Sequence, residues 1–461
     1  MPLNLEVNID GMSVTKSSKS QIWPILVSVK EQGIEPALVA AYIGKEKPDP
    51  AILLNDFVDE MSTLMSRSSG FRAGNVSFTC DLPAKKMVKC CSSYTSYGSC
   101  DYCVVRGEHY KGRRIFLDQN AVLRTNEQFR SQVDRNFHTS NSPLLPLPID
   151  MVNSFVIDYM HCVCLGVCRR LLFFFFILQG KGRLSRQVKS NVSLQLISLR
   201  ECWPSEFSRK PRSLEELKFW KATEFRSFLL YSGPLVLKGL PKRHYQLFLL
   251  LHAGISLLCG DLSEQRIVEA EDILSHFVKN CATLLGKEFI VMNVHSLIHL
   301  GQQCRQFGNL DKFSAFKFEN YLGKLKKTVR SANKPLKQII RRLPNIPDKR
   351  TSATLGRSGK IKINGIYLSK SVRDSVFLRD KSYYKIVGTK VANGTLMVEA
   401  RKFRKTNSFF DYPFSSLSVG VVVAENLSDE TFTIAVEECR KCCSFPNFDS
   451  FIIFPFLNLL C

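Results

Sequence analysis

The chain begins with short apolar segments of the kind that form β-strands. Residues 3–10, LNLEVNID, alternate apolar and polar positions, which predicts a strand with one buried face. Two further runs, IWPILVSVK at 22–30 and ALVAAYIG at 37–44, are short and contain β-branched residues, so both predict strands. NVSFTCD at 75–81 predicts a fourth strand that ends at an aspartate.

One helix is predicted between the third and fourth strands. It follows the breaker Pro48-Asp49-Pro50, and its apolar stripe consists of Leu53, Phe57, Met61 and Leu64. Three strands, a helix and a further strand, with an aspartate ending the first and the fourth strand, outline a ribonuclease-H-like α/β core. We therefore predict that residues 1–92 form the first part of such a core.

The rest of the chain divides by pattern into four segments. Residues 93–126 lack periodicity and are rich in tyrosine, glycine and cysteine, which predicts a loop. Residues 127–305 contain long apolar stretches punctuated by prolines, and we predict a helical domain inserted into the core. A further amphipathic helix or pair is expected within 306–345, and short strands with turn signals such as Asn364-Gly365 predict a small β-rich domain at 346–461.

The composition of the chain shows a strong excess of positive charge. The 461 residues have 45% apolar content, which is typical of a folded protein, and a net charge of +23, which favours a polyanionic partner. The positive charge is most concentrated between Lys324 and Arg342, where no acidic residue occurs. Eight basic residues there are candidates for nucleic-acid binding: Lys324, Lys326, Lys327, Arg330, Lys334, Lys337, Arg341 and Arg342.

Two further features bear on the compartment. The apolar run LLFFFFIL at 171–178 is too short to span a bilayer, so no membrane partner is expected. The opening MPLNLEVNID lacks a basic segment followed by an apolar one, so the 16 cysteines are expected in a reducing compartment. There, clustered cysteines are more often metal ligands or buried apolar residues than crosslinks.

Three carboxylates are candidates for phosphodiester chemistry with divalent metal ions, which requires oxygen ligands converging from different segments. Asp10 and Asp81 end predicted strands, and Glu319 follows Phe318 beside the apolar stripe of a predicted helix. Each has an ordinary alternative: Asp10 as part of a turn with Gly11, Asp81 as a strand-end turn, and Glu319 as a solvated helix residue.

Cysteine and histidine pairs form a second candidate site. Cys100-x-x-Cys103 and His295-x-x-x-His299 supply two thiolates and two imidazoles, a zinc-ligand set if the fold brings them together. Two alternatives stay open: histidines buried in a core helix, and a local site in which Cys90 and Cys91 join the cysteine pair, with His109 or His161 able to substitute. Cys439-x-x-Cys442 is a weaker pair without an evident partner.

Several of these segments together resemble CACTA-type (En/Spm-like) transposases over residues 5–342. The resemblance rests on IDGMSVTKSSKSQIWPIL, CDLPAK, VIDYMHCVCLGV and VHSLIHLGQQCRQFGNLDKFSAFKFENYLGKLKK. The order of acidic, cysteine and histidine residues is also similar to that of the catalytic subunit of the V(D)J recombinase. The segment before the cysteine pair, KCCSSYTSYGSC, departs from the family's usual glycine- and histidine-bearing sequence. The resemblance therefore does not extend to the local geometry of that loop.

The resemblance implies a nuclear enzyme that cleaves and joins double-stranded DNA with Mg²⁺ or Mn²⁺. It places the catalytic, metal-binding triad on Asp10, Asp81 and Glu319, and a structural Zn²⁺ on Cys100, Cys103, His295 and His299. Asp158 and His161 match a family motif for which we expect a structural or DNA-positioning role. A second copy of the chain is a candidate partner. The rival hypotheses are a catalytically silent, transposon-derived DNA-binding protein and a ribonuclease-H-like nuclease.

Overall fold

The computed structural model describes residues 3–13, 20–30, 35–66, 73–331, 333–345, 354–356, 359–392 and 394–457. The K-S-S part of the transposase resemblance, at 16–18, lies outside these residues. The chain forms two compact units, each built from two segments. Residues 1–167 and 281–348 make the first unit, and residues 168–280 and 349–461 make the second.

The first unit is built on a mixed sheet. Its central strand β1 (Leu3–Ile9) runs antiparallel to β3 (Gln21–Val29) and parallel to β5 (Ala73–Phe78). β4 (Ala37–Gly44) pairs with the other side of β3, and the short β2 (Met12–Ser13) pairs with the start of β3. The predicted strands are therefore confirmed, and their order across the sheet is β4-β3-β1-β5.

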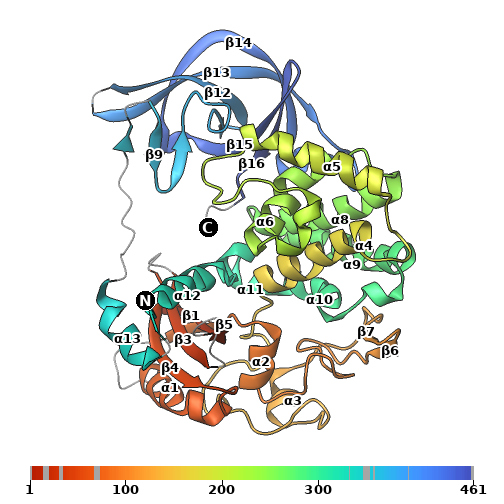
Figure 1. The fold of residues 1–461 in the computed structure, drawn as a ribbon, viewed down its shortest axis with the longest axis vertical. Helices are drawn as coiled ribbons and strands as arrows, with labels where there is room; N and C mark the ends of the chain where they lie inside the picture. Colours follow the sequence, from red (N-terminus) through yellow and green to blue (C-terminus); the bar gives the residue numbers. More distant parts are fainter. Residues whose placement is uncertain are drawn as a thin grey trace. The chain divides into compact units, whose positions relative to one another are not determined.

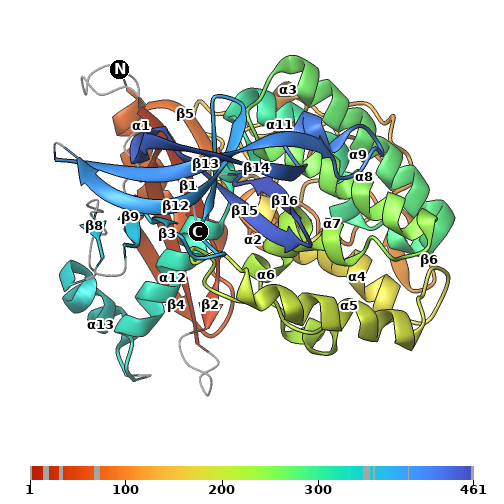
Figure 2. The same ribbon diagram turned by 90° about the horizontal axis from the view of Figure 1, so that it is seen from above.

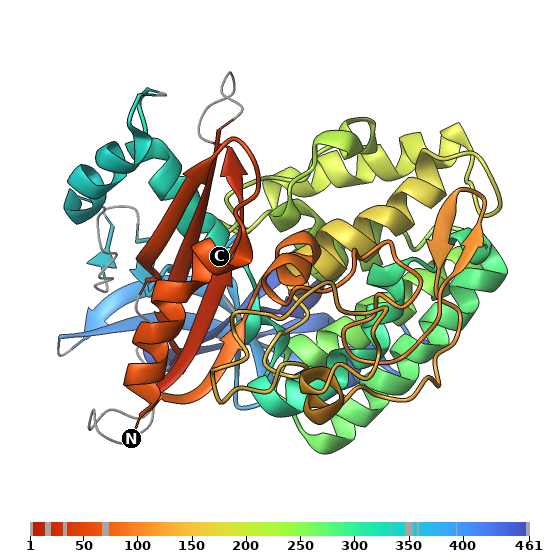
Figure 3. The same ribbon diagram turned by 90° about the horizontal axis from the view of Figure 1, so that it is seen from below.

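Helices cover both faces of this sheet. α1 (Pro50–Met65) begins at Asp49, whose side chain accepts a hydrogen bond from the Ala51 amide. It buries Leu53, Phe57 and Met61 of the predicted stripe, whereas Leu64, in its last turn, is exposed. α12 (Phe316–Thr328) and α13 (Pro335–Arg342) pack their apolar side chains on Ile22 and Leu26 of β3. Figures 1 and 3 show α1 on one face of the sheet and α12 on the other.

The remainder of the first unit connects β5 to α12. After β5 the chain forms α2 (Leu82–Val88), a long loop with the hairpin β6 (Glu108–Tyr110) and β7 (Arg113–Ile115), and α3 (Asn126–Arg130). A π-helix, η3 (Met160–Cys168), leads into the second unit. The chain returns through η7 (Lys287–Phe289), α10 (Met292–His295), η8 (Ser296–His299), α11 (Leu300–Phe307) and η9 (Leu310–Phe313), and η10 (Leu343–Asn345) follows α13.

The second unit joins helices to strands. Its helical part comprises α4 (Arg169–Phe176), α5 (Arg186–Ser198), η4 (Leu199–Glu201), η5 (Leu214–Phe219), α6 (Ala222–Ser227), η6 (Phe228–Ser232), α7 (Gly233–Val236), α8 (Lys242–Cys259) and α9 (Glu264–Leu285). The phenylalanine run at 171–178 falls largely in α4, where Phe174, Phe175 and Phe176 are buried. Across the described residues, no helix combines the length and apolarity that crossing a membrane requires.

The C-terminal strands form an antiparallel sheet that closes on itself, visible in Figures 1 and 2. It contains β11 (Val376–Arg379), β12 (Ser382–Ala392), β13 (Thr395–Ser408), β14 (Val422–Ala435), β15 (Arg440–Asn447) and β16 (Ser450–Pro455), with η11 (Ser416–Val419) and η12 (Val436–Glu438) between strands. A smaller sheet contains β8 (Thr354–Leu355), β9 (Ile361–Ile363) and β10 (Ile366–Leu368).

The turn between β9 and β10 shows how local sequence sets this part of the fold. Asn364 and Gly365 both have positive φ, at 48° and 81°, which is the backbone that a tight hairpin requires and that these two residues tolerate best. The predicted turn at Asn364-Gly365 is confirmed. The class prediction holds at the level of a mixed α/β protein with an N-terminal mixed sheet, a central helical region and a C-terminal antiparallel sheet.

Candidate functional site

Three neighbouring parallel segments of the first unit end at one edge of its sheet. β1 and β5 are parallel, and residues 154–156 extend the pattern beside β5. There the Phe78 amide donates to the Ser154 carbonyl at 2.7 Å, and the Val156 amide donates to the Phe78 carbonyl at 3.0 Å. Asp10, Asp81 and Asp158 follow these three segments. Parallel strands bring their carboxyl ends to the same edge, where sites commonly form in α/β proteins.

Asp10, Glu319 and His161 meet at this edge. One ligand atom from each lies within 4.8 Å of the corresponding atoms of the other two. Glu319 reaches the group from the first turn of α12, because Phe318 beside it is fully buried. The predicted Asp10 and Glu319 are therefore brought together across 309 positions of sequence by the packing of α12 on the sheet.

Ionisation of the Asp10 carboxyl in this group is unfavourable when no cation is bound. Burial raises the pKa of the Asp10 carboxyl, the charges of Asp81 and Glu319 raise it further, and the result is a pKa of about 8. A carboxyl with such a pKa is largely protonated at neutral pH. The cluster is thus an environment in which a bound cation would restore the ionised form of Asp10.

Asp81 lies at the margin of this group and has a second task. It is the N-cap of α2, and its side chain accepts the Ala84 amide hydrogen at 2.7 Å. The carboxylate therefore has one oxygen fixed by the helix. Its charge is the second-largest cause of the raised pKa of Asp10, but Asp81 does not belong to the group that Asp10, His161 and Glu319 form.

Asp158 organises the start of η3. Its buried carboxylate accepts hydrogen bonds from the Met160 amide at 3.0 Å, the His161 amide at 3.0 Å and the Ala315 amide at 2.8 Å. It also bonds to His161 Nδ1 at 2.6 Å. Because Ala315 directly precedes α12, Asp158 ties the histidine and the helix of Glu319 to the same carboxylate.

His161 turns its other nitrogen toward the carboxylates. Its Nε2 lies 4.0 Å from Glu319 Oε1. Burial lowers the pKa of His161, but the hydrogen bond and charge of Asp158, with the charges of Asp10 and Glu319, outweigh it and raise that pKa to about 9. The imidazole is therefore positively charged at neutral pH. The family resemblance predicted a structural or DNA-positioning role for Asp158 and His161, and it did not predict that His161 lies between Asp10 and Glu319.

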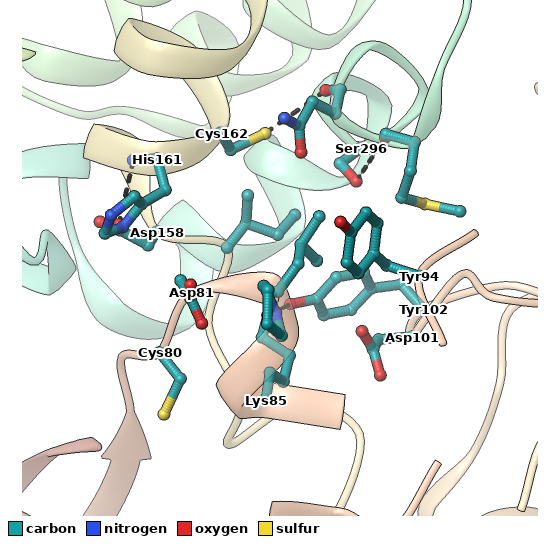
Figure 4. Close-up of a pocket in the computed structure, with 15 residues that line it drawn as sticks. Cys80, Asp81, Lys85, Tyr94, Asp101, Tyr102, Asp158, His161, Cys162 and Ser296 are labelled. Atoms are coloured by element: carbon teal, nitrogen blue, oxygen red, sulfur yellow. Dashed lines mark hydrogen bonds and ion pairs between the residues drawn. The ribbon is translucent and has the colours of Figure 1, made fainter. Parts of the chain in front are cut away.

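A cavity of about 240 Å³ opens beside Asp81 and His161. Figure 4 shows it with Tyr94 and Tyr102 on one side and the Asp158–His161 pair on the other. Lys85, the first lysine of α2, lies at its base, where its ammonium donates to the Tyr102 hydroxyl at 2.9 Å and the Val156 carbonyl at 2.6 Å. The site thus has carboxylates on one flank and room for an organic group on the other.

The predicted cysteine and histidine ligands converge on one point. Cys103 Sγ lies 3.2 Å from His295 Nε2, and Cys100 Sγ lies 3.6 Å from His299 Nε2. All four ligand atoms are within 4.8 Å of one another and all four residues are buried. A tetrahedral zinc ion with ordinary bond lengths separates sulfur and nitrogen ligands by about 3.5 Å. This Cys2His2 group can therefore hold a structural zinc, and the histidines, not Cys90 and Cys91, complete the cysteine pair.

The thiol of Cys100 is prepared for such a role. Burial raises its pKa, but hydrogen bonds with Cys103, His295 and His299 reverse the effect and bring the pKa well below its ordinary value. A thiolate is the form that binds zinc. His109 lies on the exposed β6 strand and His161 lies with the carboxylates, so neither belongs to this group. Cys439 and Cys442 lie in the second unit, where their thiols donate to the Ala435 and Arg440 carbonyls.

The cysteine loop is also bonded to the helix of Asp81. Asp101, between the two cysteines, is buried and accepts from Lys86 Nζ at 3.2 Å and Lys89 Nζ at 3.0 Å. Burial raises the pKa of Asp101, but these lysines hold it below its ordinary value. A buried pair of this kind is sensitive to loss of either partner. The position of α2, and with it Asp81, therefore depends on the loop that carries Cys100 and Cys103.

The predicted basic surface is narrower than the sequence indicated. Lys324 forms an ion pair with Glu35, and the Arg342 guanidinium donates to the Thr328 carbonyl that ends α12, so both hold the fold together. Lys326 is exposed, and its ammonium bonds to Ser13 Oγ at 3.2 Å. The remaining five predicted residues are also exposed: Lys327, Arg330, Lys334, Lys337 and Arg341. A phosphate backbone could contact these exposed cations.

Comparison with known proteins adds one match. A family described as "Domain of unknown function (DUF8592)" matches residues 353–456, most of the C-terminal strands. A search of curated proteins found no match. The carboxylate cluster and the Cys2His2 group both lie in the first unit, outside the matched residues.

Proposed function

We propose that the chain is a DNA transposase, or a domesticated derivative of one, that cleaves and joins DNA phosphodiester bonds with the help of divalent metal ions. The cluster of Asp10, His161 and Glu319 at one sheet edge, with Asp81 close enough to raise the pKa of Asp10, supports this most directly. The strand order β4-β3-β1-β5, with only β5 parallel to β1, is compatible with a ribonuclease-H-like core. The motifs that resemble CACTA-type transposases fall on the same residues.

The donor atoms suit Mg²⁺ or Mn²⁺. Carboxylate oxygens are the preferred ligands of these ions. Burial first, and the charges of Asp81 and Glu319 second, raise the pKa of Asp10, and a divalent cation would favour its ionised form. When bound, such ions activate an attacking hydroxyl and stabilise the leaving oxygen of an in-line displacement. Asp10, Asp81 and Glu319 would hold them.

The protein's own groups position the DNA around that chemistry. Asp158 fixes the ring of His161, and the charged imidazole would attract a phosphate oxygen at the carboxylates. The exposed lysines and arginines of α12 and α13 would bind the flanking phosphate backbone without reading sequence. The zinc site would be structural, because protein side chains supply all four ligands. A nuclear location is part of the same proposal.

The test is cleavage of supercoiled plasmid DNA with Mg²⁺ or Mn²⁺. The informative variants are Asp81→Asn and Glu319→Gln, because asparagine keeps the N-cap of α2 and glutamine keeps the size of the side chain. The wild type should nick the plasmid, and each variant should lose at least about a hundredfold in rate while keeping its melting temperature. Equal nicking by all three proteins would contradict the proposal.

The same experiment separates the rival functions. A protein that binds DNA in a salt-sensitive manner but nicks nothing with either metal would be the catalytically silent DNA-binding form. A protein that cuts an RNA–DNA hybrid faster than duplex DNA would be a ribonuclease-H-like nuclease. Gel filtration with and without DNA tests whether a second copy of the chain joins the complex.

A further inference from the structure

A second cavity adjoins the one beside Asp81. It has a volume of about 470 Å³, and Leu82, Tyr94, Met292 and Asn293 line both cavities. The two cavities therefore lie side by side and mark out a path that starts beside Asp81 and His161 and runs past these four shared side chains. Its size falls within the range of about 300–1,000 Å³ that is common for binding sites of organic ligands.

The far end of this path is basic and aromatic. His109, Arg113 and Arg114 of the β6–β7 hairpin line the second cavity. Arg114 also stacks on Tyr97, with its guanidinium carbon 3.3 Å from the ring centroid. Three tyrosines in this part of the sequence are exposed: Tyr94, which lines both cavities, at 40%, Tyr97 at 51% and Tyr110 at 36%. Lys111 of the same hairpin is paired with Glu288, so the cations that face the cavity come from Arg113 and Arg114.

The wall between the two cavities combines a ring with an amide. Tyr94 supplies an exposed aromatic face, and Leu82 and Met292 supply apolar surface. Asn293 supplies both a hydrogen-bond donor and an acceptor. Its side chain packs on Gly166, where a Cβ atom would lie 2.6 Å from Asn293 Nδ2. Because Gly166 leaves this space, the amide has a defined position.

These features fit a nucleobase better than duplex DNA. A duplex hides the faces of its bases and presents phosphates, whereas unpaired bases stack on aromatic side chains while arginines contact the strand. A ring such as Tyr94, an amide beside it and arginines farther along are the elements of such a site. The net charge of +23 is complementary to any nucleic-acid strand.

We propose that the two cavities, here called the strand path, bind unpaired nucleotides of the DNA strand next to the scissile phosphate. The inference rests on the proposed function, since Asp81 and His161 form the entrance of the path. A strand with its phosphate at the carboxylates passes its next nucleotide along Tyr94 and Asn293. Its backbone then reaches Arg113 and Arg114. The enzyme would thus favour DNA whose end is frayed or single-stranded at the cleavage site.

Binding measurements without catalysis test this inference. Fluorescence anisotropy with Ca²⁺ compares a blunt DNA duplex with the same duplex carrying a single-stranded DNA extension. The wild type should bind the extended probe more tightly. Tyr94→Ala should reduce that preference about tenfold, which corresponds to the loss of one stacked base, and should leave the affinity for the blunt duplex unchanged. Tyr94→Phe should retain the preference. Arg113→Ala should weaken binding of the extended probe and leave binding of the blunt duplex unchanged.

Matched controls come from the second unit. Phe219 is 69% exposed and Lys218 beside it is exposed, so Phe219→Ala and Lys218→Ala remove an equivalent ring and an equivalent charge elsewhere. Both should leave the preference intact. The inference is overturned if the wild type binds both probes equally, if Phe219→Ala acts like Tyr94→Ala, or if an RNA extension binds more tightly than DNA.

The two proposals can fail separately. A protein that cleaves plasmid DNA but shows no preference for the extended probe retains the proposed function and loses the strand path. A protein that prefers the extension through Tyr94 but cleaves nothing retains the strand path as a binding site and loses the catalytic proposal.

Discussion

Asp158 is the residue on which the geometry of the carboxylate edge depends most. It is 3% exposed and accepts three backbone amide hydrogens besides the His161 ring. We predict that Asp158→Ala lowers the free energy of unfolding by about 3 kcal/mol or more, because buried donors lose their acceptor. Asp150→Ala is the control, since Asp150 accepts similar bonds in a half-buried turn and should cost about 1 kcal/mol. Urea unfolding measures both, and equal losses would refute the role of burial.

A second residue makes stability depend on pH. His252 is fully buried in α8, its Nδ1 hydrogen bonds to the Leu229 carbonyl at 2.8 Å, and burial lowers its pKa to about 4. The unfolded chain takes up this proton near pH 6.5 and the folded chain does not. Stability should therefore be full above pH 6.5 and fall by roughly 3 kcal/mol as the pH decreases toward 4.

The variant His252→Asn isolates this contribution. Its amide nitrogen can keep the bond to Leu229 but does not titrate. Melting temperatures measured between pH 7 and 4 should decline less steeply for the variant than for the wild type. Parallel declines would show that other groups account for the acid sensitivity.

Individual site residues were predictable where both their residue type and their position beside a predicted strand or helix indicated a site. Asp10 directly follows β1, Asp81 lies between β5 and α2, and Glu319 adjoins a buried stripe, so the sequence could nominate all three. The histidine at their centre was harder. The charge of His161 depends on Asp158, Asp10 and Glu319 together, and its distance to Glu319 depends on how α12 packs. No spacing within the Asp-x-x-His motif contains that information.

At the scale of elements, the loop with Cys100 and Cys103 determines where α2 lies. The loop meets α10 and η8 at the four zinc ligands, and it is bonded to α2 through Asp101. We predict one zinc per chain by mass spectrometry of the purified protein. Chelation or Cys103→Ala should remove it and lower the free energy of unfolding by more than about 4 kcal/mol, because a bound metal contributes directly to folding.

The second cysteine pair provides the control for this prediction. Cys442 is a buried cysteine in a strand of the second unit, and its thiol bonds to the Arg440 carbonyl. Cys442→Ala should therefore retain the zinc. If Cys103→Ala also retained it, or if both variants lost it, the Cys2His2 assignment would fail.

Elements with a strong period were predicted well, whereas the hairpin β6–β7 and the buried contacts of the loop at 93–126 were not predicted. The strands at 3–10 and 22–30 and the helix at 51–65 follow from apolar periodicity. The region 93–126 has no hydrophobic period. It is held in place by buried cysteines and by a buried aspartate that pairs with lysines of the preceding segment. The pairing of Lys86 and Lys89 with Asp101 arises only in three dimensions.

At the scale of the whole molecule, the charge of +23 predicts salt-sensitive binding to DNA. We predict that replacing Lys327, Arg330 and Lys337 together by alanine lowers the slope of log affinity against log salt by about 2 to 3, because each phosphate contact contributes about 0.9. Lys324→Ala is the control in the same segment. It should leave the slope unchanged, since Lys324 pairs with Glu35. Equal effects would mean that the exposed cations hold no phosphate.

Whole-molecule organisation was only partly readable from the sequence. The mixed sheet, the helices and the C-terminal strands were predicted in order, whereas the two units interleave along the chain. Residues 281–348 return to the unit of the first sheet because α12 carries the apolar side chains that cover β3. The apolar stripe beside Glu319 predicted a helix that returns to the core, but the pattern does not reveal which strand that helix covers.

The central claim is that Asp10, Asp81 and Glu319 form a divalent-metal site. Crystals soaked in Mn²⁺ test it by anomalous diffraction, which locates the ion independently of any activity. Manganese should appear in contact with all three carboxylates in the wild type and be lost or weakened in Glu319→Gln. A structure with manganese absent from these carboxylates, or bound equally in the variant, would contradict the account.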